Sequence, residues 1–482
     1  MNLRERGINL QKKYSIKRNS IKKTVRRASS RDEVITPSSI AKKTYSDEMH
    51  INIITATSID TTNLSRLRSP IDTDTSEIRK RRHAVKNLTL KSAPPIPTAP
   101  KDPRVRFRQW ILSQIKTHIR LIDLPLFTVA LVLSLCGIFA IFSSTRSYET
   151  SRFIIVQIFG ILLGVFSALI LSVIDYRSLS SKYTYIIGIN AAILLITFIF
   201  GSSVTESTNS NWIDLGIIKI QPSEFSKLLF IYSFAVHLAS LRDKMHKFWP
   251  MIPLAIHAGI IFGLVLLQRD LGSLTIFLVI FICMCFSAGI SIWYYVGGGA
   301  ALLCISPFLW SHLSEYQRNR ILLCFDETID PEGQGIRFQQ LQSQRAIGNG
   351  GIFGTGFTEG SVTQGSGNLP AKHTDMIYST ICEEWGLIGA ILILLLTSYL
   401  VYRAFKIALS CGNTTGRYIC VGVASMLMIQ VIENVGMCLG IMPVIGITYP
   451  FLSYGGSSIL SCFLALGMVL SVSTHRENTF FK

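Results

Sequence analysis

The chain has 482 residues, of which 49% are hydrophobic and only 16% are charged. A soluble domain of ordinary composition carries roughly 25% charged residues. The apolar residues also gather into blocks of about 18 to 24 residues, the length that a bilayer core of ~30 Å requires of a helix. A large soluble helical protein is therefore disfavoured as a class, because most of its helices would need a polar face.

The net charge of +18 is concentrated at the N-terminus. Residues 1–120 hold 27 Lys and Arg against 10 Asp and Glu, whereas residues 121–482 hold 20 against 19. The first segment has too few apolar residues to offset the entropy cost of folding, so we expect a basic, disordered cytoplasmic tail. Its charge suits anionic lipid and nucleic acid equally well. Because the lipid interpretation needs no additional partner, we expect no nucleic-acid partner.

Residues 121–482 are the expected membrane domain, with an all-α polytopic fold. The apolar blocks predict ten transmembrane helices, at 124–144, 153–174, 183–200, 222–240, 251–267, 271–289, 292–310, 376–402, 417–439 and 457–474. Most of the ten cysteines lie inside these blocks and no CxxC or His-spaced set occurs, so we expect neither a disulfide framework nor a structural metal. The basic tail predicts a cytoplasmic N-terminus. An even number of spans then returns the C-terminus to the cytoplasm and places the long loop 311–375, between helices seven and eight, on the outer face.

Ionisable residues stand out at the start of the fourth predicted helix, in the sequence QPSEFSK at 221–227. Pro222 suits the first turn of a helix. Glu224 and Lys227 are three residues apart and therefore share one face at the outer end of the span. Ionisable groups there are costly unless they pair or face a wet cavity. The pair therefore predicts either a functional site or a salt bridge that locks two helices together.

The outer segment holds two further motifs. A carboxylate before proline and two spaced glycines, in Asp330-Pro-Glu-Gly-Gln-Gly335, predict a fixed, tightly turned backbone. The glycine run at 348–356 lacks the Lys-Ser/Thr that ends a phosphate-binding loop, which argues against a nucleotide site. The sequence LPAKHTD at 369–375 then leads into a helix that carries Glu383 and Glu384 in its second turn.

Each of these features also has a plain structural interpretation. Thr374 and Asp375 fit helix capping, and His373 is a candidate base that lacks an identified partner. The small residues of Ser453–Ser458, at the mouth of the last span, fit close helix packing.

Taken in order, these motifs resemble those of the SEDS family of RodA and FtsW proteins, from about residue 120 to the C-terminus. The matching segments are 221–227, 270–272 (Asp-Leu-Gly), 330–335, 342–351, 369–375, 383–389 and 450–458. Within the family, Gly360–Gln364 and Pro443–Gly446 are more similar to RodA than to FtsW. The chain departs from the family pattern at four positions, where it has Asn211 for Arg, Arg269 for Pro, Ser273 for Thr and Ala371 for Glu.

The resemblance implies a peptidoglycan glycosyltransferase that joins lipid II disaccharides into glycan strands during cell elongation and rod-shape maintenance. It implies inversion at the anomeric carbon and release of polyprenyl pyrophosphate, with Asp330 as the catalytic general base. The implied substrate-binding residues are Glu224, Lys227, Arg345, Lys372, His373, Trp212, Gln221 and Ser457. Arg269 is a further candidate contact for pyrophosphate. No cofactor is required, although a divalent cation, Mg²⁺ or Mn²⁺, could help to neutralise the pyrophosphate.

The implied location is the bacterial cytoplasmic (inner) membrane, with the active site on the outer face. The implied partners are lipid II, polyprenyl-linked glycan, membrane lipids, a class B penicillin-binding protein (a transpeptidase) and the elongation complex. Three alternatives stay open. They are an FtsW-like septal polymerase of cell division, a lipid II flippase, and a structural scaffold of the wall machinery.

Overall fold

The computed structural model describes residues 122–148, 151–201, 211–214, 219–245, 247–365 and 369–475. The prediction of a disordered tail concerns residues 1–120, which lie outside the described residues. A helix occupies each of the ten predicted ranges. These are α5 (Leu124–Thr145), α6 (Arg152–Val173), α7 (Tyr183–Phe200), α8 (Pro222–Leu241), α9 (Met251–Leu267), α10 (Leu271–Ser287), α11 (Ile292–His312), α15 (Ile377–Ser410), α16 (Thr414–Leu439) and α17 (Gly456–Thr474).

Eight of the described helices are long and apolar enough to cross a membrane, whereas α9 and α10 are shorter, with 17 residues each. At 1.5 Å per residue, a 17-residue helix is about 26 Å long, close to the lower limit for a span. The helices therefore indicate a multi-pass membrane protein. The count of ten spans stays a prediction.

The connections contain short elements. These are η2 (Arg146–Tyr148), η3 (Tyr176–Lys182), β1 (Ile213–Asp214), β2 (Lys219–Ile220), η4 (Arg242–Lys244), α12 (Glu315–Leu322), η5 (Glu327–Ile329), α13 (Phe338–Gly350) and α14 (Ser361–Gln364). β1 and β2 pair antiparallel, with Ile213 opposite Ile220. The long connection from α11 to α15 therefore contains helices of its own.

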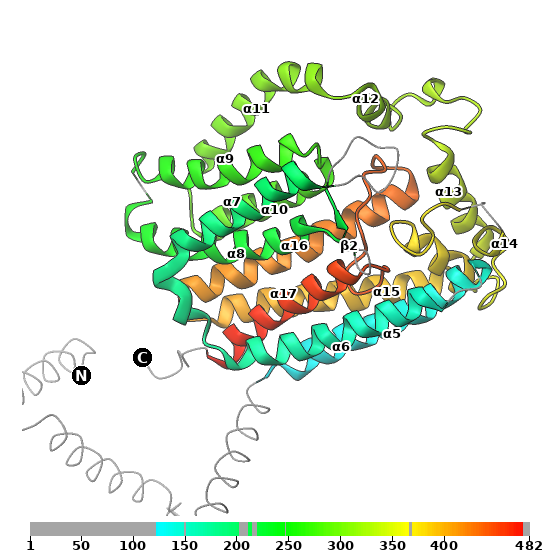
Figure 1. Ribbon diagram of the computed structural model, residues 1–482, viewed down its shortest axis with the longest axis horizontal. Coiled ribbons are helices and arrows are strands. Elements are labelled where there is room, and N and C mark those ends of the chain that lie inside the picture. Colours follow the sequence, from blue (N-terminus) through cyan, green and yellow to red (C-terminus); the bar gives the residue numbers. More distant parts are fainter. Residues whose placement is uncertain are drawn as a thin grey trace, which may run out of the picture. The chain divides into compact units, whose positions relative to one another are not determined.

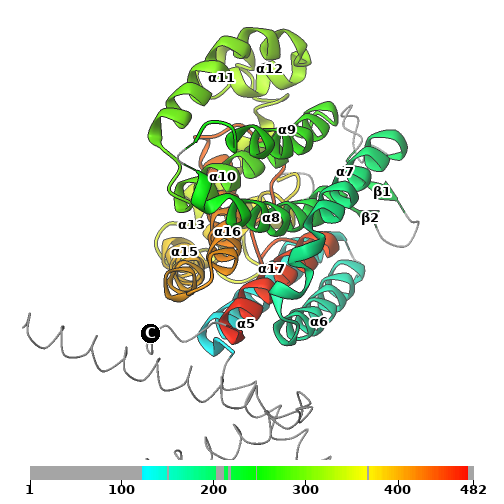
Figure 2. The same cartoon turned by 90° about the vertical axis from the view of Figure 1, so that its left-hand side faces the viewer.

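Small residues let α17 pack closely along α6 (Figures 1 and 2). A Cβ atom at Gly164 would lie 2.7 Å from the ring of Phe463, and one at Gly467 would lie 2.9 Å from the Cα atom of Ala168. Small residues such as these glycines permit the backbones of two membrane helices to approach each other closely. On another side of the bundle, α16 contacts α15, α8 and α10. No residue of α11, at the edge of the bundle, is buried.

The start of α15 differs from the sequence-based expectation in two respects. Neither Thr374 nor Asp375 caps the helix, because its N-cap is Met376 and no side chain bonds there. The helix continues to Ser410, and it is broken at Gly386, whose φ of 67° and ψ of −169° are not helical. Glycine is the residue for which such a φ costs least.

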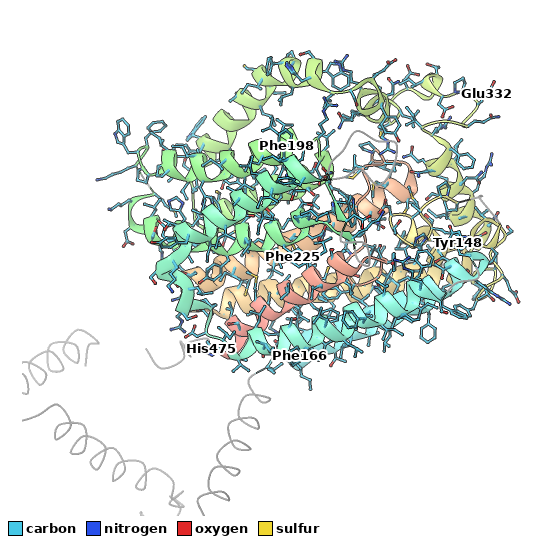
Figure 3. The ribbon with its side chains drawn as sticks, in the orientation of Figure 1. Tyr148, Phe166, Phe198, Phe225, Glu332 and His475 are labelled. Carbon is cyan, nitrogen blue, oxygen red and sulfur yellow. The ribbon has the colours of Figure 1, made fainter. Side chains whose placement is uncertain are left out.

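The long helices run between two opposite ends of the bundle. Tyr148 and Glu332 lie at the end where α5 finishes, and His475 lies at the opposite end, where α17 finishes (Figure 3). Successive long helices alternate in direction, so α8, α10, α15 and α17 begin at the Tyr148 end and α16 finishes there (Figure 1). The motifs singled out in the sequence therefore converge on the Tyr148 end.

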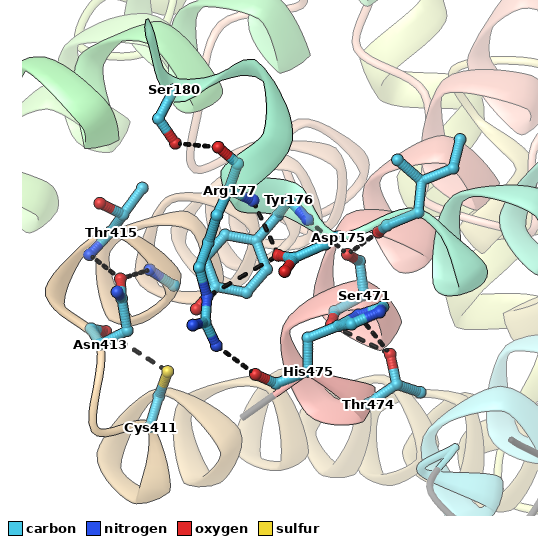
Figure 4. A network of polar contacts seen from close by, with 12 residues as sticks. Asp175, Tyr176, Arg177, Ser180, Cys411, Asn413, Thr415, Ser471, Thr474 and His475 are labelled. Carbon is cyan, nitrogen blue, oxygen red and sulfur yellow. Dashed lines mark hydrogen bonds and ion pairs between the residues drawn. The ribbon is translucent and has the colours of Figure 1, made fainter. Parts of the chain in front are cut away.

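A polar network closes the His475 end (Figure 4). The guanidinium of Arg177 donates a 2.5 Å hydrogen bond to the carbonyl of His475 and lies 3.7 Å from the carboxylate of Asp175. The hydroxyl of Ser471 donates to the carbonyl of Ile174 at 2.6 Å. These bonds satisfy carbonyls that the helix ends leave without intrahelical partners and tie the α6–α7 connection to α17.

Candidate active site

A buried ion pair lies in the first turns of α8. Lys227 Nζ is 2.7 Å from Glu224 Oε1, and the side chain of Lys227 is fully buried. The other carboxylate oxygen of Glu224 accepts a 2.8 Å hydrogen bond from the hydroxyl of Ser461 on α17. Pro222 occupies the first position of α8, as predicted. The pair therefore links two helices and also removes both charges from water.

Two more buried carboxylates lie within electrostatic range of the same lysine. Asp270 precedes α10 and accepts hydrogen bonds from the backbone N–H and the hydroxyl of Ser273, at 3.0 and 2.8 Å. Lys227 interacts electrostatically with Asp270 and with Glu433 of α16. We call Glu224, Lys227, Asp270 and Glu433 the Lys227 cluster.

One ammonium group cannot neutralise three carboxylates. Burying an uncompensated charge costs several kcal/mol, and Glu433 Oε2 is buried without a hydrogen-bond partner in the described structure. The Lys227 cluster is therefore suited to hold an additional proton or positive charge. Glu433 is not among the site residues predicted from the sequence, although a carboxylate inside an apolar run is the relevant signal.

Gln221 and Ser457 meet beside this cluster. The backbone N–H of Gln221 donates to the hydroxyl of Ser457 at 3.2 Å. Ser457 and Ser461 lie one turn apart on α17, so one face of that helix contacts both Gln221 and Glu224. Trp212, also predicted as a substrate contact, is half-buried next to β1.

Asp330 lies in a tight turn, as predicted from its sequence. Its Oδ2 atom accepts the backbone N–H groups of Gly335 and Arg337, both at 2.9 Å. Gly333, with φ of 62°, donates its N–H to the carbonyl of Asp330 at 3.1 Å. These N–H groups, that of Arg337 above all, hold the pKa of Asp330 below its ordinary value. The loop thus orients an ionised carboxylate that is partly exposed.

A second buried polar group lies at the start of α15. Glu383 is fully buried and accepts the backbone N–H groups of Val362 and Thr363, both at 2.8 Å, and the hydroxyl of Thr363. The carbonyl of Thr363 in turn accepts a 2.6 Å hydrogen bond from Lys372 Nζ. The ammonium of Lys372 also lies 5.2 Å from the ring centre of Tyr148. Glu383 therefore positions Lys372 through Thr363, a link that the sequence did not reveal.

His373 is packed among aromatic rings, whereas Arg345 is exposed. The ring of His373 packs among those of Tyr148, Phe153 and Tyr454, with centroid distances of 5.8, 4.8 and 5.6 Å. Burial, followed by the charge of Lys372, lowers the pKa of His373 to about 4. An imidazole with so low a pKa is a weak base, so His373 fits a packing role better than that of a general base. Arg345 is exposed on α13.

The predicted site residues thus fall into separate groups. Gln221, Glu224, Lys227 and Ser457 lie together, Lys372 lies beside His373, and Asp330 and Arg345 belong to the outer connection. Among the described residues, no contact joins Asp330 to the Lys227 cluster. In that part of the chain, no group of three or more His, Cys, Asp or Glu side chains could hold a metal ion.

Comparisons with known proteins identify relatives of the whole membrane domain. The model of the family described as "Cell cycle protein", FtsW/RodA/SpoVE, matches residues 122–478. Stage V sporulation protein E of Bacillus subtilis is 35% identical over 363 residues, which are 73% of this chain and 97% of that protein. The peptidoglycan glycosyltransferase MrdB of Escherichia coli K12 is 33% identical over 306 residues, 62% of this chain and 78% of MrdB. The probable peptidoglycan glycosyltransferase FtsW of Geobacter metallireducens is 34% identical over 74% of this chain and 96% of its own length.

Solved structures agree with these relatives. A chain from a peptidoglycan synthase complex that coordinates polymerization and crosslinking superposes with a TM-score of 0.62 at 29% identity, over 73% of this chain and 97% of that one. The rod shape determining protein RodA of Thermus thermophilus gives a TM-score of 0.55 at 25% identity, over 74% of this chain and 97% of RodA. The family match covers well over half of the chain. The chain therefore belongs to the FtsW/RodA/SpoVE family, the SEDS proteins, whose curated relatives include peptidoglycan glycosyltransferases.

Proposed function

We propose that this chain is a peptidoglycan glycosyltransferase that joins lipid II disaccharides into glycan strands and releases polyprenyl pyrophosphate. Family membership and the names of the relatives support this enzyme class. Within the chain, the Lys227 cluster carries the proposal, because it gathers four buried ionisable side chains inside the helical bundle. A scaffold needs no ionisable groups inside the membrane, where they are costly.

Asp330 is the proposed general base. The 4-hydroxyl of the acceptor sugar attacks the anomeric carbon of the donor, the bond to pyrophosphate breaks, and the hydroxyl proton passes to the carboxylate. Both backbone hydrogen bonds fall on Oδ2, so we assign Oδ1 to the acceptor hydroxyl. A pKa below the ordinary value keeps this carboxylate ionised at neutral pH and therefore able to accept the proton.

Cations take the place of a general acid in this reaction. Pyrophosphate leaves as an anion, so positive charge near it stabilises the transition state. Arg345 is exposed and is the first proposed contact. Lys372, whose buried ammonium donates one hydrogen bond to the carbonyl of Thr363, is the second proposed contact. A divalent cation bound to the pyrophosphate itself, Mg²⁺ or Mn²⁺, would add to this charge, although the described residues offer no ligand set for one.

The remaining site residues are proposed to bind and orient the lipid-linked sugars. Glu224 and Lys227 orient the reacting groups, and Trp212, Gln221 and Ser457 line the approach to them. For His373 we propose an indirect role, because its packed ring fixes the backbone next to Lys372.

The elongation role is favoured by two RodA-like segments, Gly360–Gln364 and Pro443–Gly446. The first supplies Thr363, which connects Glu383 to Lys372. An FtsW-like role in division is the alternative, since relatives named SpoVE, FtsW and MrdB have similar identities. The similarity to a chain of a peptidoglycan synthase complex supports a class B penicillin-binding protein as partner.

We further propose that all ten long helices cross the cytoplasmic membrane. Both termini then lie in the cytoplasm, and the connection from α11 to α15 lies on the outer face, where glycan strands are built. The basic tail supports this orientation through its charge. The end of the bundle that bears the site is then the outer end.

Polymerisation of lipid II by the purified full-length protein tests the proposal. The reaction is run with and without the class B partner, and products are separated by length on a gel. We expect long glycan strands that form without added nucleotide. A lipid II flippase would instead transfer labelled lipid II across vesicle membranes and give no polymer, so folded protein with that behaviour would contradict the proposal.

A further inference from the structure

The connection between α13 and α14 carries apolar side chains that the described structure leaves uncovered. Phe353 is 82% exposed, Ile352 59% and Phe357 44%. The proposed reaction uses none of them. Large apolar side chains gathered on a surface mark a site of interaction with protein or membrane. We call residues 351–357 the apolar loop. Its exposed side chains therefore indicate a surface that another molecule covers.

The contacts of Phe357 show where the apolar loop lies along the axis of α5. Its ring stacks on that of Phe142, with a centroid distance of 6.2 Å, and meets the ring of Phe139 edge-on at 6.3 Å. Both partners are exposed on α5, a helix apolar enough to cross a membrane. Phe139 precedes the last residue of α5, Thr145, by six positions, or about 9 Å along the axis. The apolar loop therefore lies beside the end of a membrane helix and not above it.

Four backbone groups of the apolar loop are satisfied by the break in α15. At Gly386 the helix loses its regular hydrogen bonds, which frees carbonyl and N–H groups on either side. The N–H of Thr355 donates to the carbonyl of Glu383 at 2.9 Å, and the N–H of Leu387 donates to the carbonyl of Gly351 at 2.9 Å. Two further bonds of this kind join Gly356 N to Glu384 O at 3.2 Å and Ile388 N to Ile352 O at 3.3 Å. Irregular backbone at membrane depth needs hydrogen-bond partners, from protein as here or from a water-filled cavity.

Two glycines permit this contact. A Cβ atom at Gly354 would lie 2.2 Å from the carbonyl oxygen of Glu384, and one at Gly386 would lie 2.3 Å from the backbone nitrogen of Gly354. Both have positive φ, at 86° and 67°. The loop is therefore fitted to the broken helix and held against it.

A polar contact marks where the apolar surface ends. Arg146 directly follows α5 and donates to the hydroxyl of Thr358, the residue after Phe357, at 3.1 Å. A cation and a hydroxyl at the end of an apolar surface are typical of the boundary between a membrane and water. The exposed faces of α5 and of the apolar loop thus form one continuous apolar surface with a common polar edge.

We infer that the apolar loop is a re-entrant element that inserts into the lipid leaflet at the Tyr148 end of the bundle, with Ile352 and Phe353 in contact with acyl chains. The occupant is lipid hydrocarbon, because the loop continues the exposed face of a membrane helix and four of its backbone groups are hydrogen-bonded to α15. The inserted loop fixes the broken start of α15, and with it Glu383, at a defined depth. This inference rests on the membrane location of the chain and not on its proposed reaction.

Spin labelling in lipid nanodiscs tests the inference. One nitroxide is attached at Phe353→Cys of the full-length protein and another at Glu332→Cys, the matched control in the same connection, with the accessible native cysteines replaced by serine. Oxygen concentrates in the bilayer, whereas a nickel chelate stays in water. We expect the label at position 353 to collide preferentially with oxygen and the label at position 332 with the nickel chelate.

Preferential collision with nickel at both positions would overturn the inference. Shielding of position 353 from both reagents in the purified protein would overturn it too, since protein would then cover the loop. Oxygen accessibility of position 353 that appears only after another membrane protein is added would also overturn the inference. Normal thermal unfolding of Phe353→Cys, compared with the unsubstituted chain, shows that the label reports on the folded protein.

Discussion

Replacing Lys227 by methionine should destabilise the protein more than replacing Glu224 by glutamine. Lys227 is fully buried and is the only ammonium that the described structure places among Glu224, Asp270 and Glu433. Its loss leaves three carboxylates without a counter-charge, and breaking a buried ion pair from one side costs about 3–5 kcal/mol. Loss of the Glu224 charge costs less, because Lys227 still interacts electrostatically with Asp270 and Glu433, and a glutamine can still accept from Ser461.

The double variant should lose less stability than the two single variants together, with a coupling energy of about 1–3 kcal/mol. The measurement is thermal unfolding of each variant in detergent, with polymerisation activity recorded in parallel. Asp214→Asn is the matched control, because Asp214 and Lys219 form a 3.5 Å pair with both side chains about half exposed. Such a pair contributes at most about 1 kcal/mol. Additive losses in the Lys227 and Glu224 variants would refute the pairing and our account of the cluster.

Three other predictions concern the tail, the topology and pH. Deletion of residues 1–100 should leave polymerisation in detergent intact but alter localisation or partner recruitment in cells, as measured by gel assay and imaging, and an inactive truncated enzyme would contradict this. An impermeant thiol reagent should label Glu332→Cys in intact spheroplasts and Lys244→Cys only after the membrane is opened, with accessible native thiols replaced, and the reverse pattern would refute the topology. The pKa of His373 falls on folding from about 6.5 to about 4, so the unfolded chain binds the extra proton and stability should drop by up to about 3 kcal/mol as the pH falls from 6.5 to 4. His373→Phe should remove this component of the pH dependence of thermal unfolding, and an unchanged profile would count against the packed neutral imidazole.

The helices could be predicted from the sequence because a bilayer imposes a minimum length on every apolar block that crosses it. Pro222 lies at the first residue of α8, as predicted, because the N–H that proline lacks would have no hydrogen-bond partner in the first turn of a helix. The turn at Asp330 was predictable for a similar local reason, because its proline and glycines restrict the backbone within a few residues.

The links between distant segments were not predictable. Glu383 holds the backbone of Val362 and Thr363, about twenty residues away, and nothing in the local sequence names these partners. The break at Gly386 was missed because a glycine inside an apolar run is equally compatible with a straight helix. The prediction that Asp375 caps α15 was wrong. A capping pattern in the sequence is also compatible with a helix that begins one residue later, and α15 begins at Ile377.

Asp330 is proposed to accept the proton of the acceptor hydroxyl, and a comparison of Asp330→Asn with Asp326→Asn tests this role. Asp326 is an exposed carboxylate of the same connection that accepts the N–H of Thr328 at 2.9 Å, and it is a matched control for charge and loop structure. Removing a general base typically lowers the rate by a factor of about 10²–10⁴. In the gel assay with lipid II, we expect a loss of this size for Asp330→Asn, near wild-type polymerisation for Asp326→Asn, and unchanged thermal unfolding of both. Near wild-type polymerisation by Asp330→Asn, or an equal loss in both variants, would contradict this role.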